Sequence, residues 1–388
     1  MQSFPFIDFL ITGDGCRPLL RLLEEINGGQ RFGTVPNLSY REDGRVKYGP
    51  REMLNDSDVV QADRQLLHSI PTARGCPLDC MTCGGSCHAF LGSGGYSPVT
   101  DYSVDSILEK LSQTPRDLAR PLRVFLIHDP ILTMGRERWG LLADEIHRMG
   151  INASFVIEFF LPHAKEDIHL IAEKLPGSCI SFSPESMDED VRSFHKNLRY
   201  ANDELIMNLK TIAEIDDITM RVWYLAGLAK DSKASIDATV TFIEDFYRGI
   251  RNLEEDLLVY TEMLFIDPGS LAFNDPVRYG FNMLNKSLAE HIASFELPLF
   301  KYQLNYQTEL LTRKQLFDLF LYMHNKMNRI YHANGILADA HYGRVRLYNK
   351  LLKKYEPKYD GALALDEQEA REREFATIGA HFRLDLGG

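Results

Sequence analysis

The sequence predicts an α/β protein in which six short strands form a parallel sheet. Apolar runs of strand length alternate with stretches whose apolar residues recur at helical spacing, a pattern typical of strand–helix–strand units. Polar residues follow several of these runs directly, and in barrels of parallel strands the chemistry lies at those strand ends. The expected strands span residues 66–70, 123–128, 152–158, 179–183, 217–225 and 257–265.

The residues before the first of these strands are expected to form a small strand–helix cap. An apolar run ends at the turn Gly13-Asp-Gly15, and apolar residues then recur at helical spacing up to Ile26. The polar residues 50–66 are expected to connect this cap to the core. The sequence thus divides into an N-terminal cap at 1–62, a core at 63–275 and a C-terminal extension at 276–388.

The C-terminal extension is expected to be mainly helical. Residues 271–307 are rich in aromatic side chains and show no regular period, so we expect an irregular segment there. Thr312 has the character of an N-cap for a long amphipathic helix that begins at Arg313. A second helix is expected to stop before Pro357, because proline disfavours helix in the residue that precedes it. The polar residues 362–377 are expected to form a surface helix or a partly disordered tail.

The composition is that of an ordinary globular protein with an acidic surface. The chain has 388 residues, of which 45% are apolar and 25% charged, and its formal net charge is −12. This balance argues against nucleic acid as an obligatory partner, because phosphate binding requires a basic face. No apolar run approaches the roughly 18 residues of a membrane-spanning helix, and the N-terminus lacks the regions of a signal peptide. We therefore expect a cytoplasmic protein with no membrane partner.

Three cysteines in one loop have the spacing of a metal-cluster site. Cys76, Cys80 and Cys83 are separated by four and three positions, so their thiolates can converge on one soft metal centre from a single loop. Three such ligands suggest an iron–sulfur cluster with one iron left open to a substrate or cofactor. Two alternatives remain: Cys87 completes a four-cysteine zinc or closed-cluster site, or the cysteines are unrelated buried thiols. The scattered positions of the other cysteines do not resemble a disulfide framework.

The motif Cys76-x-x-x-Cys80-x-x-Cys83 resembles the cluster motif of the radical S-adenosylmethionine (radical SAM) superfamily. The resemblance implies a [4Fe-4S] cluster whose open iron binds S-adenosylmethionine, and a partial (β/α)6 barrel formed by the six strands. It also implies reductive cleavage of S-adenosylmethionine to a 5′-deoxyadenosyl radical, with an electron donor such as flavodoxin or ferredoxin. The family usually has an aromatic residue before the third cysteine, where this chain has Thr82.

Several polar or small residues match positions that contact S-adenosylmethionine in the family. Gly84 and Gly85 follow the third cysteine and would let the backbone approach the methionine moiety. Asp129 stands where many members carry a Gly-Gly-Glu element for the amino group, and its alternative role is to begin a helix. Glu185 lies in a Ser-Pro-Glu-Ser segment that resembles the ribose-contacting element of the family, and its alternative role is to cap the helix from Met187.

The resemblance assigns three further residues to the cofactor. Lys196 follows His195 in a segment that resembles the Arg/Lys-Lys element of the family, although a charge at a helix end is usually solvated. Arg221 lies within the fifth strand, where it would hold the cofactor carboxylate if it faces the barrel; strand alternation also allows the outward direction. Gly227 ends that strand, where adenine approaches the backbone in relatives.

The N-terminal cap resembles the last strand and helix of the cobalamin-binding domain that precedes the barrel in one branch of the family. That branch ends the strand with a Gly-Glu/Asp-Gly-Glu turn, and Cys16 replaces the final acid here. The Asp-x-His-x-x-Gly cobalt-ligand motif of that domain is not in this sequence. Cobalamin is therefore a possible cofactor that this chain does not support, and a plain strand–helix cap fits equally well.

The resemblance predicts an enzyme that abstracts hydrogen from a small-molecule or peptide substrate, with methylation or rearrangement as candidate outcomes. One other hypothesis is a non-catalytic metalloprotein in which Cys87 closes a four-cysteine site for zinc or electron transfer. Replacement of Cys87 would abolish metal retention in that case and leave the cluster intact in the first. A third hypothesis is a barrel that keeps its cluster but serves as a scaffold for a partner chain, which predicts no cleavage of S-adenosylmethionine.

Overall fold

The structure is a computed structural model of the whole chain. It describes residues 1, 5–13, 15–52, 67–92, 99–113, 121–249 and 257–386. Asp14, most of the predicted linker and the predicted boundary between residues 62 and 63 lie outside the described residues. The contacts within the chain define two compact units: Met1–Pro184, Ser193–Val222 and Ile266–Asp275 form the first, and Glu185–Arg192, Trp223–Phe265 and Pro276–Gly388 form the second.

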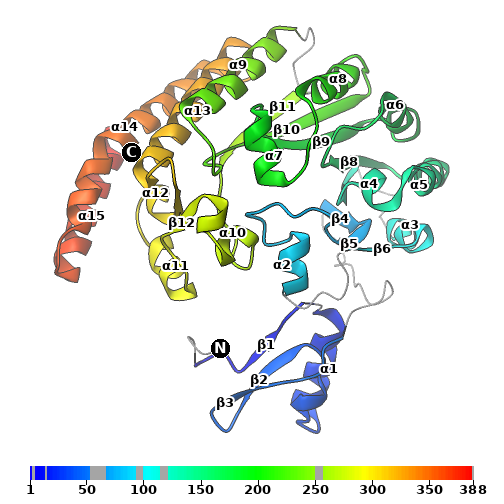
Figure 1. Cartoon of the computed structure of the whole chain (residues 1–388), viewed down its shortest axis with the longest axis horizontal. Helices are drawn as coiled ribbons and strands as arrows, with labels where there is room; N and C mark the ends of the chain where they lie inside the picture. Colours follow the sequence, from blue (N-terminus) through cyan, green and yellow to red (C-terminus); the bar gives the residue numbers. More distant parts are fainter. Residues whose placement is uncertain are drawn as a thin grey trace. The chain divides into compact units, whose positions relative to one another are not determined.

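A six-stranded sheet confirms the predicted α/β fold (Figure 1). Its strand order is β11-β10-β9-β8-β7-β4, and the described ladders from β4 through β9 are parallel. Each strand overlaps one of the six that the apolar runs predicted, although Leu66 of the first run lies outside the described residues. The strands are β4 (Leu67–Pro71), β7 (Leu122–Ile127), β8 (Ala153–Phe159), β9 (Ser178–Glu185), β10 (Ile218–Ala226) and β11 (Leu257–Met263).

One face of this sheet is covered by helices and the other is partly exposed. In β10, Met220 and Val222 are buried, whereas Thr219 and Arg221, which alternate with them along the strand, are only half-buried. The buried side chains point toward the helices of the first unit, which cover that face of the sheet (Figure 1). Neighbouring helices of this layer contact one another. The inner, partly exposed face therefore has room for a ligand. These helices are α3 (Val104–Ser112), α5 (Arg136–Met149), α6 (Lys165–Lys174) and α8 (Asn202–Ala213).

The N-terminal cap contains more structure than the strand–helix pair that the sequence predicts. The strand β1 (Phe9–Ile11) and the helix α1 (Cys16–Asn27) are followed by a hairpin of β2 (Leu38–Glu42) and β3 (Arg45–Tyr48). The three strands form an antiparallel sheet in the order β1-β2-β3. The sequence indicates an extended stretch with a turn over residues 35–45, but not the pairing of two strands, because the second strand is largely exposed and lacks an apolar run.

The prediction of an irregular segment over residues 271–307 is wrong. In the second unit a short antiparallel ladder joins Phe281–Met283 (β12) to Tyr306–Thr308 (β13), and two helices lie between them in the sequence. These elements are α11 (Leu288–Phe295) and α12 (Phe300–Gln303). Each is too short to show a period in the sequence, and the two strands pair over a separation that local pattern does not reveal.

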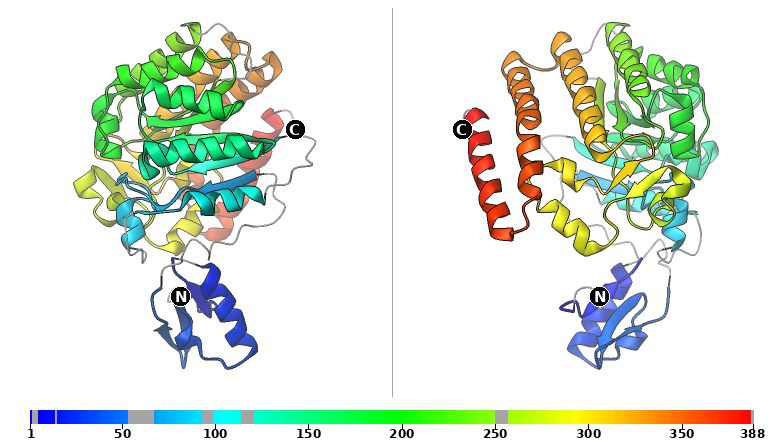
Figure 2. Two further views of the ribbon diagram at one scale, coloured as in Figure 1. Left: turned by 90° about the vertical axis from the view of Figure 1, so that its right-hand side faces the viewer. Right: turned by 60° about the vertical axis from the view of Figure 1, so that its left-hand side comes forward.

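Three long helices end the chain and lie side by side (Figure 2). Thr312 caps the first as predicted, since its hydroxyl accepts a hydrogen bond from Gln315 N at 3.4 Å. The prediction that a helix stops before Pro357 is wrong, because α14 continues through it. The helices are α13 (Arg313–Ala333), α14 (Asp339–Leu363) and α15 (Gln368–Leu386).

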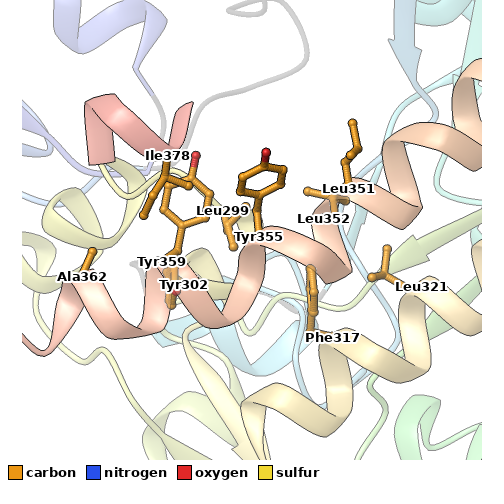
Figure 3. Close-up of a cluster of buried hydrophobic side chains, with 10 residues drawn as sticks. All are labelled: Leu299, Tyr302, Phe317, Leu321, Leu351, Leu352, Tyr355, Tyr359, Ala362 and Ile378. Atoms are coloured by element: carbon orange, nitrogen blue, oxygen red, sulfur yellow. The ribbon is translucent and has the colours of Figure 1, made fainter. Parts of the chain in front are cut away.

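Packing explains why α14 tolerates an internal proline, which costs about 3 kcal/mol in an isolated helix. Tyr355, Tyr359 and Ala362 flank Pro357 on the buried side of α14 and belong to one apolar cluster (Figure 3). Ending the helix at Pro357 would expose the last two of these side chains, and burial of an aromatic or aliphatic side chain is worth about 1.5–3 kcal/mol. No helix among the described residues is long and apolar enough to cross a membrane.

Candidate functional site

The cysteine loop follows the carboxyl end of β4, at the edge of the sheet where the polar strand ends meet. Thr72 continues β4, and its buried hydroxyl donates a hydrogen bond to Ile127 O at 2.8 Å, which ties the start of the loop to the end of β7. The short strand β5 (Ala73–Gly75) then pairs with β6 (Val99–Asp101). Cys76 is the next residue, so the first cysteine directly follows a segment that β7 and β6 hold in place.

Backbone hydrogen bonds from distant parts of the first unit fix the middle of the loop. Met81 N donates to His195 O at 3.1 Å, and Met81 O accepts from Ala272 N at 2.7 Å. Thr82 O accepts from Asp267 N at 3.0 Å. Met81 and Thr82 are both buried, and they lie between Cys80 and Cys83. The fold around the loop therefore helps to fix the conformation of its middle.

The three predicted ligands differ in exposure, and two of them receive backbone hydrogen bonds. Cys76 and Cys80 are partly buried, and Cys83 is exposed. Leu78 N lies 3.5 Å from Cys76 Sγ, and Gly85 N lies 3.3 Å from Cys83 Sγ. Burial raises the pKa of the Cys76 thiol to about 11. Such N–H···S contacts stabilise thiolate ligands and tune the reduction potential of an iron–sulfur cluster. The thiols of this loop and the backbone N–H groups beside them therefore suit an iron–sulfur cluster.

Cys87 is the fourth cysteine near the loop and would complete the alternative four-cysteine site. In the part of the chain that the structure describes, no three Cys, His, Asp or Glu side chains converge closely enough to hold one metal ion. A zinc ion would draw its sulfur ligands together, since each Zn–S bond is only about 2.3 Å long. Cys87 begins the helix α2 (Cys87–Gly92), and no disulfide joins any of the described cysteines.

Thr82 occupies the position where an aromatic residue was expected, and it packs against a histidine. Its hydroxyl lies 3.3 Å from His195 Nε2, and both side chains are buried. The same histidine accepts the Met81 hydrogen bond through its carbonyl group. His195 thus supports the cysteine loop at two points, although the sequence analysis mentioned it only as the neighbour of Lys196.

Gly84 has a structural reason to be glycine. Its N–H donates to Asp267 Oδ2 at 2.8 Å, and a Cβ on Gly84 would lie 2.9 Å from the Cβ of Asp267. Asp267 therefore contacts the loop through its own backbone N–H and through its carboxylate. A larger residue at Gly84 would push the loop away from this anchor. The predicted contact of Gly84 and Gly85 with the cofactor remains a prediction.

Asp129 is engaged within the fold. It is fully buried with a φ of +45°, and its side chain caps the helix α4 (Pro130–Met134) by accepting from Leu132 N at 3.0 Å. Its other oxygen accepts from Phe160 N at 2.8 Å, and His163 Nε2 lies 2.9 Å from both oxygens. These contacts support the alternative role of Asp129 in beginning a helix, because they leave the carboxylate little capacity for a cationic ligand.

Glu158 and Lys196 bring opposite charges near Cys76. Glu158, at the carboxyl end of β8, is half-buried and accepts from His128 N at 2.7 Å. Lys196 is only 3% exposed and donates through Nζ to Ser183 O. Burial is the largest cause of the raised pKa of the Cys76 thiol. The charge of Glu158 raises this pKa further, and the charge of Lys196 lowers it. Lys196 is therefore not a solvated helix-end charge, and Glu158 is a candidate that the sequence analysis missed.

Arg221 faces the inner side of the sheet. The Thr219 side chain hydrogen-bonds the Cys179 thiol of the adjacent strand, and the charge of Arg221 also acts on that thiol. Two residues farther along both strands, Arg221 comes beside Ser181 on the same face. Ser181 lies opposite Glu158 in the β8–β9 register. A carboxylate and a guanidinium thus flank a small residue on the inner face, and Arg221 has the inward direction that a cofactor contact requires.

Comparisons with known proteins agree with this architecture. No family model matches the chain. Over 169 residues it is 26% identical to the uncharacterized methyltransferase PH0819 of Pyrococcus horikoshii, a match that covers 40% of this chain and 35% of that protein. The cobalamin-dependent S-adenosylmethionine radical enzyme OxsB, solved with aqua-cobalamin and S-adenosylmethionine, superposes on 99% of this chain at a TM-score of 0.56 and 12% identity. The chain has the radical SAM fold.

A second solved structure supports the same conclusion. The radical SAM methyltransferase TsrM from Kitasatospora setae, with cobalamin and a [4Fe-4S] cluster bound, matches 72% of this chain at a TM-score of 0.55 and 12% identity. The chain spans 56% of the length of each of these two structures and about a third of PH0819. At these identities the likeness establishes the radical SAM fold, while the reaction is a matter for proposal.

Two residues that the sequence assigns to the cofactor lie at strand ends of this fold: Glu185 is the last residue of β9, and Gly227 directly follows β10. Both have a left-handed backbone, with φ of +69° and +98°. Gly227 N donates to Asp231 Oδ2 at 2.9 Å, and Gly227 O accepts from the buried Tyr306 hydroxyl at 2.9 Å. A Cβ on Gly227 would lie 2.2 Å from that hydroxyl oxygen. Tyr306 thus requires a glycine at 227, whether or not adenine also approaches there.

Proposed function

We propose that this chain is a radical SAM enzyme in which Cys76, Cys80 and Cys83 hold a [4Fe-4S] cluster. The observation that carries the proposal is the cysteine loop, whose backbone is fixed at the carboxyl end of a parallel sheet by hydrogen bonds to His195, Asp267 and Ala272. The cluster, when bound, would supply one electron for the reductive cleavage of S-adenosylmethionine to a 5′-deoxyadenosyl radical.

The residues of the inner face would bind and orient the cofactor and the substrate. Glu158 would attract a cationic amine, and Arg221 would hold a carboxylate in a two-pronged contact. Lys196 places a buried positive charge beside the cluster loop, where it favours the thiolate form of Cys76. These three charges differ from Asp129, whose carboxylate serves the backbone.

Methyl transfer is the reaction class that we propose, and a small molecule or peptide is the substrate class that we propose for it. PH0819 is named a methyltransferase, and TsrM is a radical SAM methyltransferase. Both solved relatives are cobalamin proteins by their descriptions, so cobalamin is a cofactor to test here rather than one to assign. A flavodoxin or ferredoxin would serve as the electron donor.

The first experiment is anaerobic reconstitution with iron and sulfide, followed by reduction with dithionite in the presence of S-adenosylmethionine. We expect 5′-deoxyadenosine from the wild-type chain and none from a Cys80→Ala variant. Cys16→Ala is the matched control, since Cys16 lies in the N-terminal cap and should leave the product unchanged. A reconstituted cluster that yields no 5′-deoxyadenosine would contradict the proposal.

A Cys87→Ala variant distinguishes the remaining alternative. It should retain its iron and its visible absorption if Cys76, Cys80 and Cys83 suffice for the cluster. Loss of all bound metal in this variant, or a preference for zinc in the wild-type chain, would support a closed four-cysteine site. Repeating the assay with S-adenosylmethionine labelled in the methyl group, with and without aqua-cobalamin, then tests methyl transfer directly.

A further inference from the structure

The two long helices α13 and α14 of the second unit line an open surface pocket that the proposed chemistry does not use. The pocket has a volume of about 310 Å³, within the size range of small-ligand sites. On α13 it is lined by Tyr322, Asn325, Lys326 and Arg329. These positions follow the spacing i, i+3, i+4 and i+7, which places all four side chains on one face of the helix.

The facing helix contributes a matching set. Tyr342, Arg346 and Lys353 of α14 line the other side of the pocket. The two helices are held together by the apolar cluster that contains Leu321 and Leu352 (Figure 3), so the pocket stands on a packed scaffold. Sites on packed helices hold their side chains more firmly than sites on loops.

The charge of the pocket is strongly positive. Four of the seven lining residues are cations, and none of the seven is acidic. Three acids lie close to the pocket: Asp237 accepts a hydrogen bond from the Tyr322 hydroxyl at 2.5 Å, Glu244 lies 3.8 Å from Arg329, and Asp318 lies 3.9 Å from Lys353. Asp237 is also paired with Lys233, and Glu244 and Asp318 have closer partners outside the pocket, at 2.6 Å in Arg248 and at 2.9 Å in Lys314. The acids therefore neutralise the pocket only in part, although the whole chain carries a net charge of −12.

The tyrosine rings in the pocket are occupied on their faces. Lys326 Nζ lies 5.4 Å from the centre of the Tyr322 ring, and Lys233 Nζ lies 4.6 Å from it. His332 stacks on Tyr342 at 4.2 Å, and the Arg346 guanidinium lies 5.6 Å from the centre of that ring. The rings thus help to position the cations by cation–π attraction.

We propose that this pocket binds a small phosphorylated anion, of the chemical class of pyrophosphate or the phosphate tail of a nucleotide. Two guanidinium groups and two ammonium groups around one pocket suit an anion with several oxygens, because arginine contacts phosphate with paired hydrogen bonds. Recognition is by charge, since four of the seven lining side chains are cations. The cations surround a bounded pocket and do not form a stripe, which favours a small ligand over a nucleic-acid backbone.

Calorimetric titration of the full chain with inorganic pyrophosphate at low salt tests the proposal. We expect saturable binding that weakens as salt is added. A Lys326→Gln/Arg346→Gln variant should bind at least about tenfold more weakly, because each charge-assisted hydrogen bond contributes roughly a factor of ten or more. The matched control is Arg344→Gln/Lys358→Gln, which removes one arginine and one lysine charge from exposed positions on other faces of α14. The control should bind like the wild type.

Three outcomes would overturn the proposal. The first is the absence of saturable binding to the wild-type chain at millimolar pyrophosphate. The second is an equal loss of affinity in the control variant, which would show that overall charge and not the pocket attracts the anion. The third is binding of a single-stranded oligoribonucleotide that depends on Lys326 and Arg346, without binding of pyrophosphate. Circular dichroism of both variants verifies that their helices are intact.

Discussion

Replacing Gly227 with alanine is expected to destabilise the protein, because two separate penalties act at this position. The backbone of Gly227 has a φ of +98°, and a left-handed conformation costs a residue with a Cβ about 1–2 kcal/mol. The new Cβ would also lie 2.2 Å from the Tyr306 hydroxyl oxygen. The hydroxyl must then leave Gly227 O, and an unsatisfied buried polar group costs about 1–3 kcal/mol. Together these predict a loss of about 2–5 kcal/mol.

A double-mutant cycle separates the two penalties. Tyr306→Phe alone removes the hydrogen bond to Gly227 O at a cost of about 1–3 kcal/mol. In the Gly227→Ala/Tyr306→Phe variant that hydrogen bond is lost only once and the clash is relieved, while the backbone strain remains. The double variant should therefore be about 1–3 kcal/mol more stable than the sum of the two single losses predicts.

Urea unfolding followed by tryptophan fluorescence measures these differences, since Trp223 lies on β10 close in sequence to Gly227. Gly343→Ala is the matched control. Gly343 lies inside α14 with open space where its Cβ would stand, so alanine should stabilise that helix by about 0.5–1 kcal/mol. Additivity of the two losses within about 0.5 kcal/mol would refute the reasoning. If the two losses are additive and Gly227→Ala also abolishes 5′-deoxyadenosine formation, contact with the cofactor would instead explain why residue 227 is glycine.

Two further perturbations test carboxylates that the fold holds by hydrogen bonds. Asp129→Ala should lower the free energy of unfolding by about 3 kcal/mol, because it leaves two backbone donors and His163 without their acceptor. Unchanged thermal stability together with weakened S-adenosylmethionine binding would instead show that Asp129 contacts the cofactor. Burial raises the pKa of Asp360, but hydrogen bonds from Lys301 and Tyr302 outweigh it and hold the pKa below its usual value. The ionised Asp360 carboxylate therefore stabilises the fold above its unfolded-state pKa, and this stabilisation is lost as pH falls through its folded-state pKa. Urea unfolding of the wild type and of Asp360→Asn should give free energies of unfolding whose difference narrows from about pH 5 to pH 3. A difference that is constant over this range would contradict that assignment.

The strands of the sheet could be predicted because each is a short segment rich in apolar residues with a clear end. β9 and β10 are examples, since a parallel strand between two neighbours and under a layer of helices buries most of its residues. The antiparallel ladder of β12 and β13 gave no such signal, because three-residue strands cannot show a period. Pro357 misled the prediction for the opposite reason: a strong local preference was outweighed by the apolar cluster that α14 shares with α13 and α15.

The cysteine ligands were visible in the sequence because a loop places all three within eight consecutive residues. Their supports were not visible, because they come from far along the chain. His195 is 113 residues away from Thr82, and Asp267 is 183 residues away from Gly84. No local pattern links such pairs, and each of the two supports resembles an ordinary helix-end or turn residue when considered alone. Chain topology brings them to the loop, which is information that only the fold contains.

The strand-end residues of this chain have two different functions, and burial together with the hydrogen-bond partners distinguishes them. Asp129 is fully buried, and backbone N–H groups and His163 use both of its oxygens, so it stabilises the turn from β7 into α4. Glu158 and Arg221 remain half-buried on the inner face, where a ligand can reach them. A buried carboxylate with its acceptor capacity used cannot respond to a cofactor without unfolding its surroundings, whereas a half-buried one can. The charge that meets the cofactor amine is therefore expected one strand farther along the sheet than the motif implies, at Glu158.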